Sequence, residues 1–486
     1  MCVKKEKGTA PLFKGFRMPF NCSKRGELLS VALILFVFLA LQLHAIRGGN
    51  YAGQDYQRHI AAMRDSARDP LGTLTAPLEV EMATPTAYHN MGGGVYSILG
   101  EGGAWKVMAI INVIWNICAL LLFYLFIRRV VRSFLLRVSC MIFMTFLPVT
   151  VITSMVVASD AFMPLFFITA VWLLILIVDR LEKGRSAAGL MAWEGALLIV
   201  AFLVKNSFIF IFAGMAVIGI ILHRYGILRG RQFLFAVFLI IVIPVTVFAM
   251  LWFGYLNKQT PMYLNRNIPR VFWNHVDSRS LLFLKKKDVH LLDAPFFHEK
   301  KFQDGRFFCP IQESGYYSYP ALLHLGIFTD VLNIDQPIRY HSNDPGVIDE
   351  YYTRVRPQDN QNRMKFSVRS ALVFSFSAFF AVFWWICVCL RAVGLRKDPQ
   401  EIPMMILLVL GLSLFLGYTL TLPLTPFPYT QGGWLPRFTL SSILSFWMIF
   451  FAALDRLPLT RPQAVRWAIL AMVIGQSLLH ISFLWV

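Results

Sequence analysis

Long apolar runs alternate with short polar turns along almost the whole chain. Most runs contain about 20 residues, the length that a helix needs to cross the hydrocarbon core of a membrane. The pattern predicts an all-α polytopic membrane protein with about 11 transmembrane helices. A transmembrane β-barrel would instead show short segments of alternating hydrophobicity. The expected helices cover approximately residues 28–46, 105–127, 134–157, 161–178, 190–204, 208–222, 233–255, 371–390, 402–420, 438–454 and 467–485.

Two long polar segments, residues 48–103 and 256–369, interrupt this series. They divide the chain into a basic N-terminus (1–27), helices 1–7 with the first polar segment between them (28–255), the second polar segment, and helices 8–11 (370–486). The second segment is too long for an idle connector and is rich in Tyr, Asp and Pro. We therefore expect its loops to form a small soluble domain outside the membrane.

Basic residues gather in every second turn between the apolar runs. The chain has 46 Lys and Arg against 27 Asp and Glu, a net charge of +19, yet only 15% of its residues are charged. Lys and Arg in alternate short loops follow the positive-inside rule. This rule predicts a cytoplasmic N-terminus, with both long polar segments on the outer side. It also explains the charge without a nucleic-acid partner, and no nucleic-acid motif is present.

The first outer segment, residues 48–103, contains a concentration of polar side chains that suit chemistry. Asp55, Arg58 and His59 have the i, i+3, i+4 spacing that places side chains on one helical turn. Tyr88 and His89 follow, just before three glycines at 92–94 that we expect to be flexible. A simple membrane anchor would not need such a loop, so we interpret it as a catalytic loop.

Three further charged residues lie where the expected topology reaches the outer side: Asp160, Lys205 and Arg437. Each one alone is equally well explained as an interfacial residue that faces water. Charged groups near a membrane are costly unless they are paired, solvated or functional. Together with Asp55 on the same side, they favour one shared cavity. Glu194, within an expected helix, is interpreted as a structural or interfacial carboxylate.

These residues also carry a resemblance to a known class of enzymes. Over about residues 28–454 the chain resembles the GT-C class of membrane glycosyltransferases, particularly the protein O-mannosyltransferases and the aminoarabinose transferases of lipid A. Many of those enzymes have two adjacent acids in the first loop, whereas Tyr56 follows Asp55 here. The matching segments are Gln54-Asp55-Tyr56, Thr84-Pro85-Thr86-Ala87-Tyr88-His89, Ser159-Asp160-Ala161, Lys205 and Leu435-Pro436-Arg437-Phe438.

The resemblance implies transfer of a sugar from a polyprenyl-phosphate donor to a lipid, glycan or protein acceptor, in contact with membrane lipids, at a bacterial inner (plasma) membrane. Asp55 and Asp160 are then the candidate catalytic residues. The candidate substrate-binding residues are Arg58, His59, Tyr88, His89, Lys205 and Arg437. No Cys/His spacing suggests a zinc site, and both a site without a cofactor and a divalent metal remain open.

Residue chemistry fits these roles. A carboxylate such as Asp55 can take the proton of an acceptor hydroxyl, and the guanidinium of Arg437 can bind phosphate oxygens in a bidentate way. Lys205 would assist as a compact positive charge, and Asp160 would hold a cation or orient the acceptor. A secondary transporter, and a lipid-polymer ligase or flippase, are the alternative interpretations. Sugar transfer by the purified protein, compared with substrate flux in sealed vesicles, discriminates between them.

Overall fold

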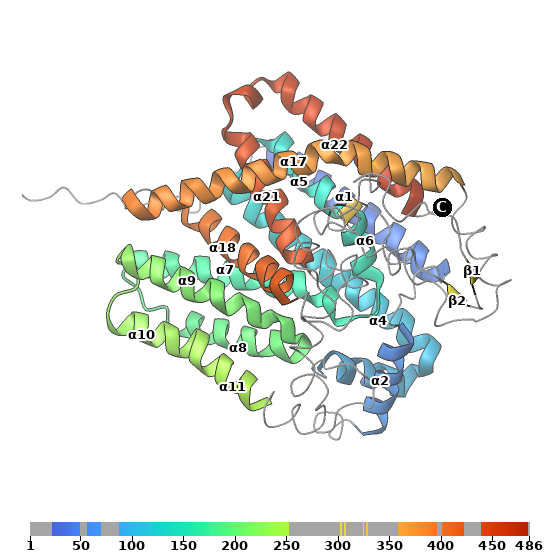
Figure 1. Ribbon diagram of the computed structural model, residues 1–486, viewed down its shortest axis with the longest axis horizontal. Helices are drawn as coiled ribbons and strands as arrows, with labels where there is room; N and C mark the ends of the chain where they lie inside the picture. The colour runs from blue at the N-terminus through green and yellow to red at the C-terminus, as the bar shows by residue number, and fades with distance from the viewer. Residues whose placement is uncertain are drawn as a thin grey trace, which may run out of the picture.

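The protein is a bundle of long helices (Figure 1). The computed structural model describes residues 22–48, 56–69, 87–251, 302–303, 306–307, 324, 327–328, 358–395, 401–421 and 439–484. Almost all of these residues are helical, and a pair of two-residue strands, β1 (Phe302–Gln303) and β2 (Arg306–Phe307), lies in the second polar segment. The expected soluble domain of residues 256–369 otherwise lies largely outside the described residues.

A helix is present at each of the eleven expected positions. Among the described residues, seven helices are long and apolar enough to cross a membrane, or eight if the bent pair α5–α6 is one span. Two more, α8 and α9, are apolar but shorter. The all-α polytopic class is confirmed, and the number of eleven spans stays a prediction. The helices are α1 (Cys22–Gly48), α4 (Ala87–Val130), α5 (Phe134–Thr145) with α6 (Pro148–Met155), α7 (Met163–Glu182), α8 (Ala188–Val204), α9 (Ile211–Arg224), α10 (Arg231–Val237) and α11 (Ile243–Leu251) joined by π-helical turns at Phe238–Val242, α17 (Gln358–Leu395), α18 (Ile402–Thr421), α21 (Leu440–Arg456) and α22 (Gln463–Leu484).

The third expected helix, residues 134–157, is broken. It consists of α5 and α6, which are bent by 52° relative to each other. Pro148 is the first residue of α6. Proline lacks a backbone N–H and its ring clashes with the preceding helical turn, so it starts a helix well and interrupts one badly.

The first polar segment is more helical than its polarity suggests. Residues Tyr56–Arg68 form α2, and α4 begins at Ala87, well before the expected start at residue 105. The expectation of a flexible stretch at residues 92–94 is wrong, because these glycines lie inside α4. A break comes later, at Gly100, whose φ of 67° is a left-handed conformation.

The glycines instead let α2 approach α4 closely, as the two helices lie together in Figure 1. A Cβ atom on Gly93 would lie 3.0 Å from the backbone nitrogen of Ala67 and 3.0 Å from the Ser66 side chain. Gly94, one position further along, has nothing within 4 Å. Gly93 therefore lies in the contact with α2, whereas a side chain at Gly94 would have free space.

This contrast gives a matched test of the helix contact. Alanine stabilises a helix interior by about 1 kcal/mol relative to glycine, so Gly94→Ala should raise the thermal stability of the purified protein. Gly93→Ala should lower it, because the added methyl group pushes α2 away from α4. Equal stabilisation by both substitutions in a thermal unfolding experiment would contradict the close packing of α2 on α4.

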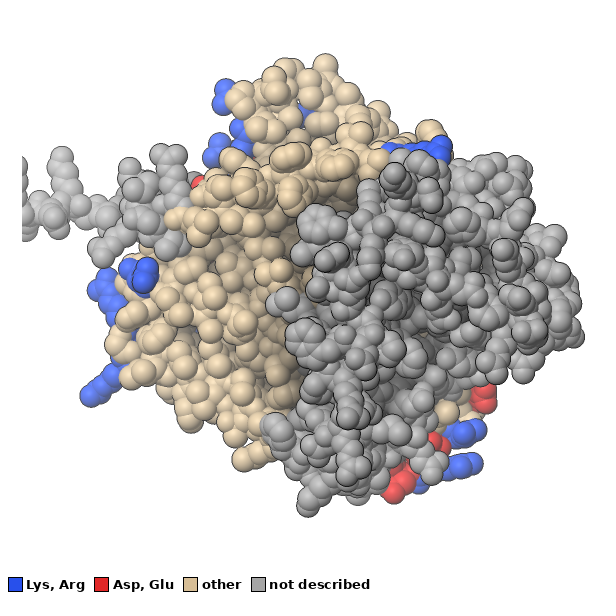
Figure 2. Space-filling view, viewed as in Figure 1, with Lys and Arg blue, Asp and Glu red and all other residues tan. Residues whose placement is uncertain are grey.

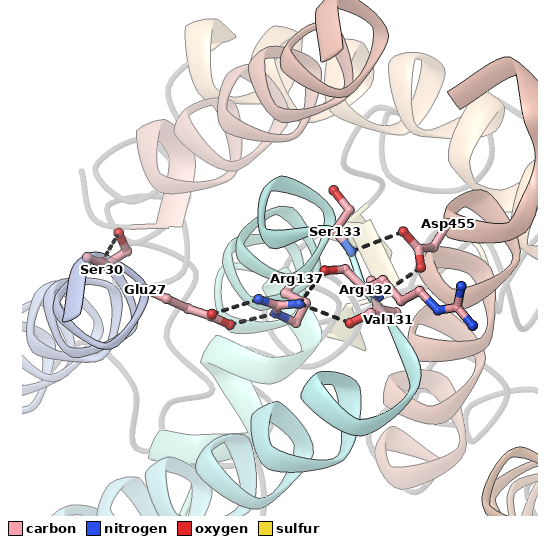
Figure 3. A network of polar contacts seen from close by, with 8 residues as sticks. Glu27, Ser30, Val131, Arg132, Ser133, Arg137 and Asp455 are labelled. Atoms are coloured by element: carbon pink, nitrogen blue, oxygen red, sulfur yellow. Dashed lines mark hydrogen bonds and ion pairs between the residues drawn. The ribbon is translucent and has the colours of Figure 1, made fainter. Parts of the chain in front are cut away.

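At the end of the bundle away from α2, a network of polar contacts joins α1, α5 and α21 (Figure 3). Arg137 donates two hydrogen bonds to the Glu27 carboxylate, at 2.6 and 2.7 Å, and thereby joins α5 to α1. Asp455 at the end of α21 accepts hydrogen bonds from the backbone N–H groups of Arg132 and Ser133. Figure 2 shows Lys and Arg side chains along the left and upper margins and again at the lower right beside acidic side chains, with an uncharged surface between the left margin and the centre.

Candidate functional site

A buried ion pair joins two of the candidate residues. Asp160 lies in a 3₁₀ turn (Ser159–Phe162) just before α7, and Lys205 is the residue that ends α8. The Lys205 Nζ lies 2.8 Å from Asp160 Oδ1, and the side chains are 13% and 1% exposed. Because α7 and α8 are consecutive and antiparallel, the end of α8 returns to the start of α7. The sequence placed both charges on one side, and the structure brings them into contact.

Two asparagines of α4 hold the irregular backbone around Asp160. Asn112 Nδ2 donates to the carbonyl of Val156 at 2.7 Å, and Asn116 Nδ2 donates to the carbonyl of Ala161 at 2.9 Å. Both side chains are buried. Buried backbone carbonyls outside a helix need such partners, since water cannot reach them. Sequence reasoning missed both residues, although polar side chains four positions apart within an apolar run are a visible signal.

Tyr88 and the two candidate histidines lie next to this turn. His59 Nδ1 and His89 Nε2 are 2.8 Å apart, and the two rings are stacked with centroids separated by 5.1 Å. In this hydrogen bond one ring nitrogen carries the proton and donates, and the other is unprotonated and accepts. The Tyr88 ring packs edge-on against both histidines and against Phe162 of the 3₁₀ turn. His59 therefore docks α2 onto the first turn of α4.

Asn112 connects the two groups of residues. Its Nδ2 atom also lies 3.2 Å from the Tyr88 hydroxyl, to which it donates. Tyr88, His89 and His59 thus form one cluster with Asp160 and Lys205, contributed by α2, α4, the 3₁₀ turn and the residue directly after α8. We call these five residues the polar cluster.

The remaining candidates cannot be placed against the polar cluster. Asp55 and Arg437 lie outside the described residues. Arg58 belongs to α2, but only its place on the helix is described. Asp55 directly precedes Tyr56, the first residue of α2, and His59 is in the first turn of the same helix.

The polar cluster does not by itself form a metal site. Within the described parts of the chain, no three His, Cys, Asp or Glu side chains converge as metal ligands. The Asp160 carboxylate already contacts the Lys205 ammonium. What the cluster offers chemically is a carboxylate, a cation, a phenol and two imidazoles, groups that can bind or move protons and hold anions.

Glu194 was interpreted from the sequence as a structural or interfacial carboxylate, and its burial argues against the interfacial alternative. It is fully buried in α8, and neither carboxylate oxygen has a hydrogen-bond partner among the described residues. It lies eleven positions before Lys205 along α8, a distance of about 16 Å. A buried carboxylate of this kind within a membrane-spanning bundle is expensive and is typically functional.

Comparison with known proteins gives little further information. No protein-family profile matches the chain, and no curated protein is significantly similar in sequence. Among solved structures, the chain is similar to the Saccharomyces cerevisiae protein O-mannosyltransferase Pmt1-Pmt2 complex bound to the sugar donor, with a TM-score of 0.37 and 14% identity. The similarity covers 49% of this chain and 34% of the yeast chain. A similarity this partial does not show that the two proteins share an activity.

Proposed function

We propose that this protein is an integral-membrane glycosyltransferase that moves a sugar from a polyprenyl-phosphate donor to an acceptor on the outer side of the membrane. The observation that carries the proposal is the buried Asp160–Lys205 pair at one end of a bundle of membrane-spanning helices, beside Tyr88 and the histidine pair. The motif resemblance to GT-C enzymes supports the same reaction, since two of its short motifs contain Asp160 and Lys205.

The proposed reaction is one displacement at the anomeric carbon of the sugar. The acceptor hydroxyl oxygen forms a bond to this carbon while the bond to the phosphate oxygen breaks, and polyprenyl phosphate leaves with the electron pair. Asp55 takes the hydroxyl proton as general base. Lys205 and Arg437 stabilise the negative charge that develops on the leaving phosphate.

Asp160 has a positioning role in this proposal. By pairing with Lys205, it fixes the ammonium group in one place before the donor binds. A charge that is already in position stabilises a transition state without the free-energy cost of moving groups during the reaction. Tyr88, His89, His59 and Arg58 would contact the sugar or the acceptor.

One observation favours a second candidate, a secondary transporter. Glu194 is a buried carboxylate within the bundle and is remote from the polar cluster. Carboxylates of this kind mark proton or ion pathways in transporters. The two candidates therefore depend on different residues and can be separated by substitution.

The experiment that tests the proposal uses sealed vesicles containing the purified protein. Sugar transfer from a radiolabelled polyprenyl-phosphate mannose and proton-coupled solute uptake are measured side by side for Asp160→Asn and Glu194→Gln. The transferase proposal expects transfer that is lost in Asp160→Asn and retained in Glu194→Gln. Uptake that is lost in Glu194→Gln, with no transfer by any variant, would favour the transporter.

The proposal also fixes which end of the bundle faces outward. Glu101, exposed on α4, is expected outside, and Ser186, exposed in the turn between α7 and α8, is expected in the cytoplasm next to Arg180 and Arg185. In intact cells, an impermeant thiol reagent should label Glu101→Cys and should label Ser186→Cys only after lysis. The reverse labelling pattern would contradict the orientation and place the polar cluster in the cytoplasm.

A further inference from the structure

An apolar cavity lies among α17, α21 and α22, which are neighbours in the upper part of Figure 1. Its volume is about 410 Å³, within the range of about 300–1,000 Å³ that is usual for small-molecule sites. Its walls include Phe380 and Trp384 of α17, Leu454 of α21, Leu457 directly after α21, and Ile469 and Met472 of α22. Phe380 is 64% exposed and Met472 is 52% exposed, so the cavity opens to the outside of the bundle as a groove.

The groove belongs to the end of the bundle that is opposite the polar cluster. Asp455 of α21 directly follows the groove residue Leu454, and its carboxylate accepts hydrogen bonds from the backbone between the end of α4 and the start of α5. The end of α4 is in turn joined to Asp179, at the far end of α7, by a 2.9 Å ion pair from Arg129. Since α7 has 20 residues, about 30 Å separate this end from the start of α7, where Asp160 lies.

Three arginines, Arg456, Arg461 and Arg466, lie directly before or within the short segment that joins the groove residues Leu457 and Ile469. Arg456 lies with its guanidinium 4.3 Å from the centre of the Trp385 ring, beside the groove residue Trp384. Arg466 is one helical turn before Ile469 and therefore on the same face of α22. Arg461 is exposed in the turn between α21 and α22.

The turn that carries these arginines is well fixed. Arg466 Nε donates a 2.8 Å hydrogen bond to the backbone carbonyl of Thr460. The Thr460 hydroxyl donates a 2.9 Å hydrogen bond to the backbone carbonyl of Leu457. Arg456 pairs with Glu401 at 3.3 Å. Two carboxylates at this end, Glu401 and Asp455, are bound to Arg456 and to the backbone N–H groups of Arg132 and Ser133, so neither is bonded to Arg461 or Arg466 among the described contacts.

We infer that this groove holds an acyl chain of an anionic glycerophospholipid, whose phosphate lies against Arg461 and Arg466. A basic rim beside an apolar groove is complementary to a molecule with an anionic head and a hydrocarbon tail, and basic sites between helices on the cytoplasmic side recognise anionic head groups. A polyprenyl-phosphate donor whose phosphate lies at the polar cluster cannot place that same phosphate against Arg461 and Arg466, which lie at the opposite end of the bundle about 30 Å away. The site is thus a second lipid site, independent of the proposed reaction.

Lipid binding to the full-length protein tests this inference. The protein is titrated in detergent with phosphatidylglycerol or with phosphatidylcholine, each carrying brominated acyl chains, and tryptophan quenching is measured. Phosphatidylglycerol should quench wild-type protein at lower concentration than phosphatidylcholine, and the quenching should diminish in Trp384→Phe. Arg461→Gln and Arg466→Gln should each weaken this binding by roughly fivefold, the equivalent of about 1 kcal/mol per basic residue.

Matched controls separate the groove from general lipid contact. Ala381 lines the groove and Ala213 is exposed on α9, so Ala381→Phe should abolish the preference for phosphatidylglycerol and Ala213→Phe should not. Arg224→Gln, at the end of α9, should leave the affinity unchanged. Equal quenching by both lipids, unchanged binding in Ala381→Phe, or displacement of phosphatidylglycerol by polyprenyl phosphate would overturn the inference.

Discussion

Replacing Lys205 by methionine should reduce sugar transfer by about 10²–10³-fold, the usual effect of removing one preorganised group that stabilises transition-state charge. It should also lower the free energy of unfolding by about 3–5 kcal/mol, because the Asp160 carboxylate would be left buried without its cation. Asp160 is 1% exposed and its Oδ1 lies 2.8 Å from Lys205 Nζ. The measurements are the transfer rate and the thermal stability of the purified variant.

A second variant separates loss of chemistry from loss of folding. In Asp160→Asn with Lys205→Met, both charges are removed, and replacing a buried ion pair by uncharged groups is often neutral for stability. We expect the double variant to recover stability but not transfer. Arg129→Met removes the 2.9 Å ion pair with Asp179 at the opposite end of the bundle. It should lower the thermal stability, but the folded protein should transfer sugar at the wild-type rate. Recovery of transfer in the double variant would show that the pair is only structural.

Replacing Asp55 by asparagine should lower turnover by about 10²–10⁴-fold, the contribution that is typical of a general base. The amide keeps the shape of the side chain but cannot accept the proton of the acceptor hydroxyl. Donor binding and thermal stability should persist, because the proton transfer belongs to the chemical step. Asp55→Glu should retain part of the activity, since it keeps a carboxylate displaced by one methylene group.

Asp65 provides the matched control on the neighbouring helix. It lies on α2, is partly exposed, and makes a 3.8 Å contact with Arg64. Asp65→Asn should therefore leave turnover near that of the wild-type protein. Near-normal turnover in Asp55→Asn would assign the base elsewhere, and Asp160 would be the next carboxylate to substitute.

The sequence predicted the helices well where apolar length alone decides the structure. The first span was expected at residues 28–46 and lies within α1, and α18 begins at the expected residue 402. An apolar run of this length in a membrane must satisfy its backbone hydrogen bonds internally, so it has few alternatives to a helix.

The errors arose where tertiary contact decides the structure. Three consecutive glycines usually signal a flexible stretch, but Gly92 and Gly93 are buried against Met63 and Ser66 of α2. Helix packing of this kind uses small residues to bring backbones together, and a local pattern does not reveal it. The bend at Pro148 was more accessible, since proline inside an apolar run is a recognised break.

The same distinction applies to the candidate site. The alternation of basic loops predicted Asp160 and Lys205 at the same end of the helices, and the structure shows them in contact. The alternation contained no information on the contact between them, or on Asn112 and Asn116, whose role depends on the path of the backbone from Val156 to Ala161. Whether Asp55 and Arg437 complete the site stays a prediction.

The measurement that tests the central claim most directly is the release of free polyprenyl phosphate by the purified protein. Two radiolabelled donors are supplied, polyprenyl-phosphate mannose and polyprenyl-phosphate aminoarabinose, each with a membrane extract as the source of acceptors. A membrane glycosyltransferase should release polyprenyl phosphate from at least one donor, in equal amount to the sugar transferred, and Lys205→Met should release far less. No release from either donor by a stable, folded wild-type preparation that instead moves a solute across sealed vesicles would contradict the claim.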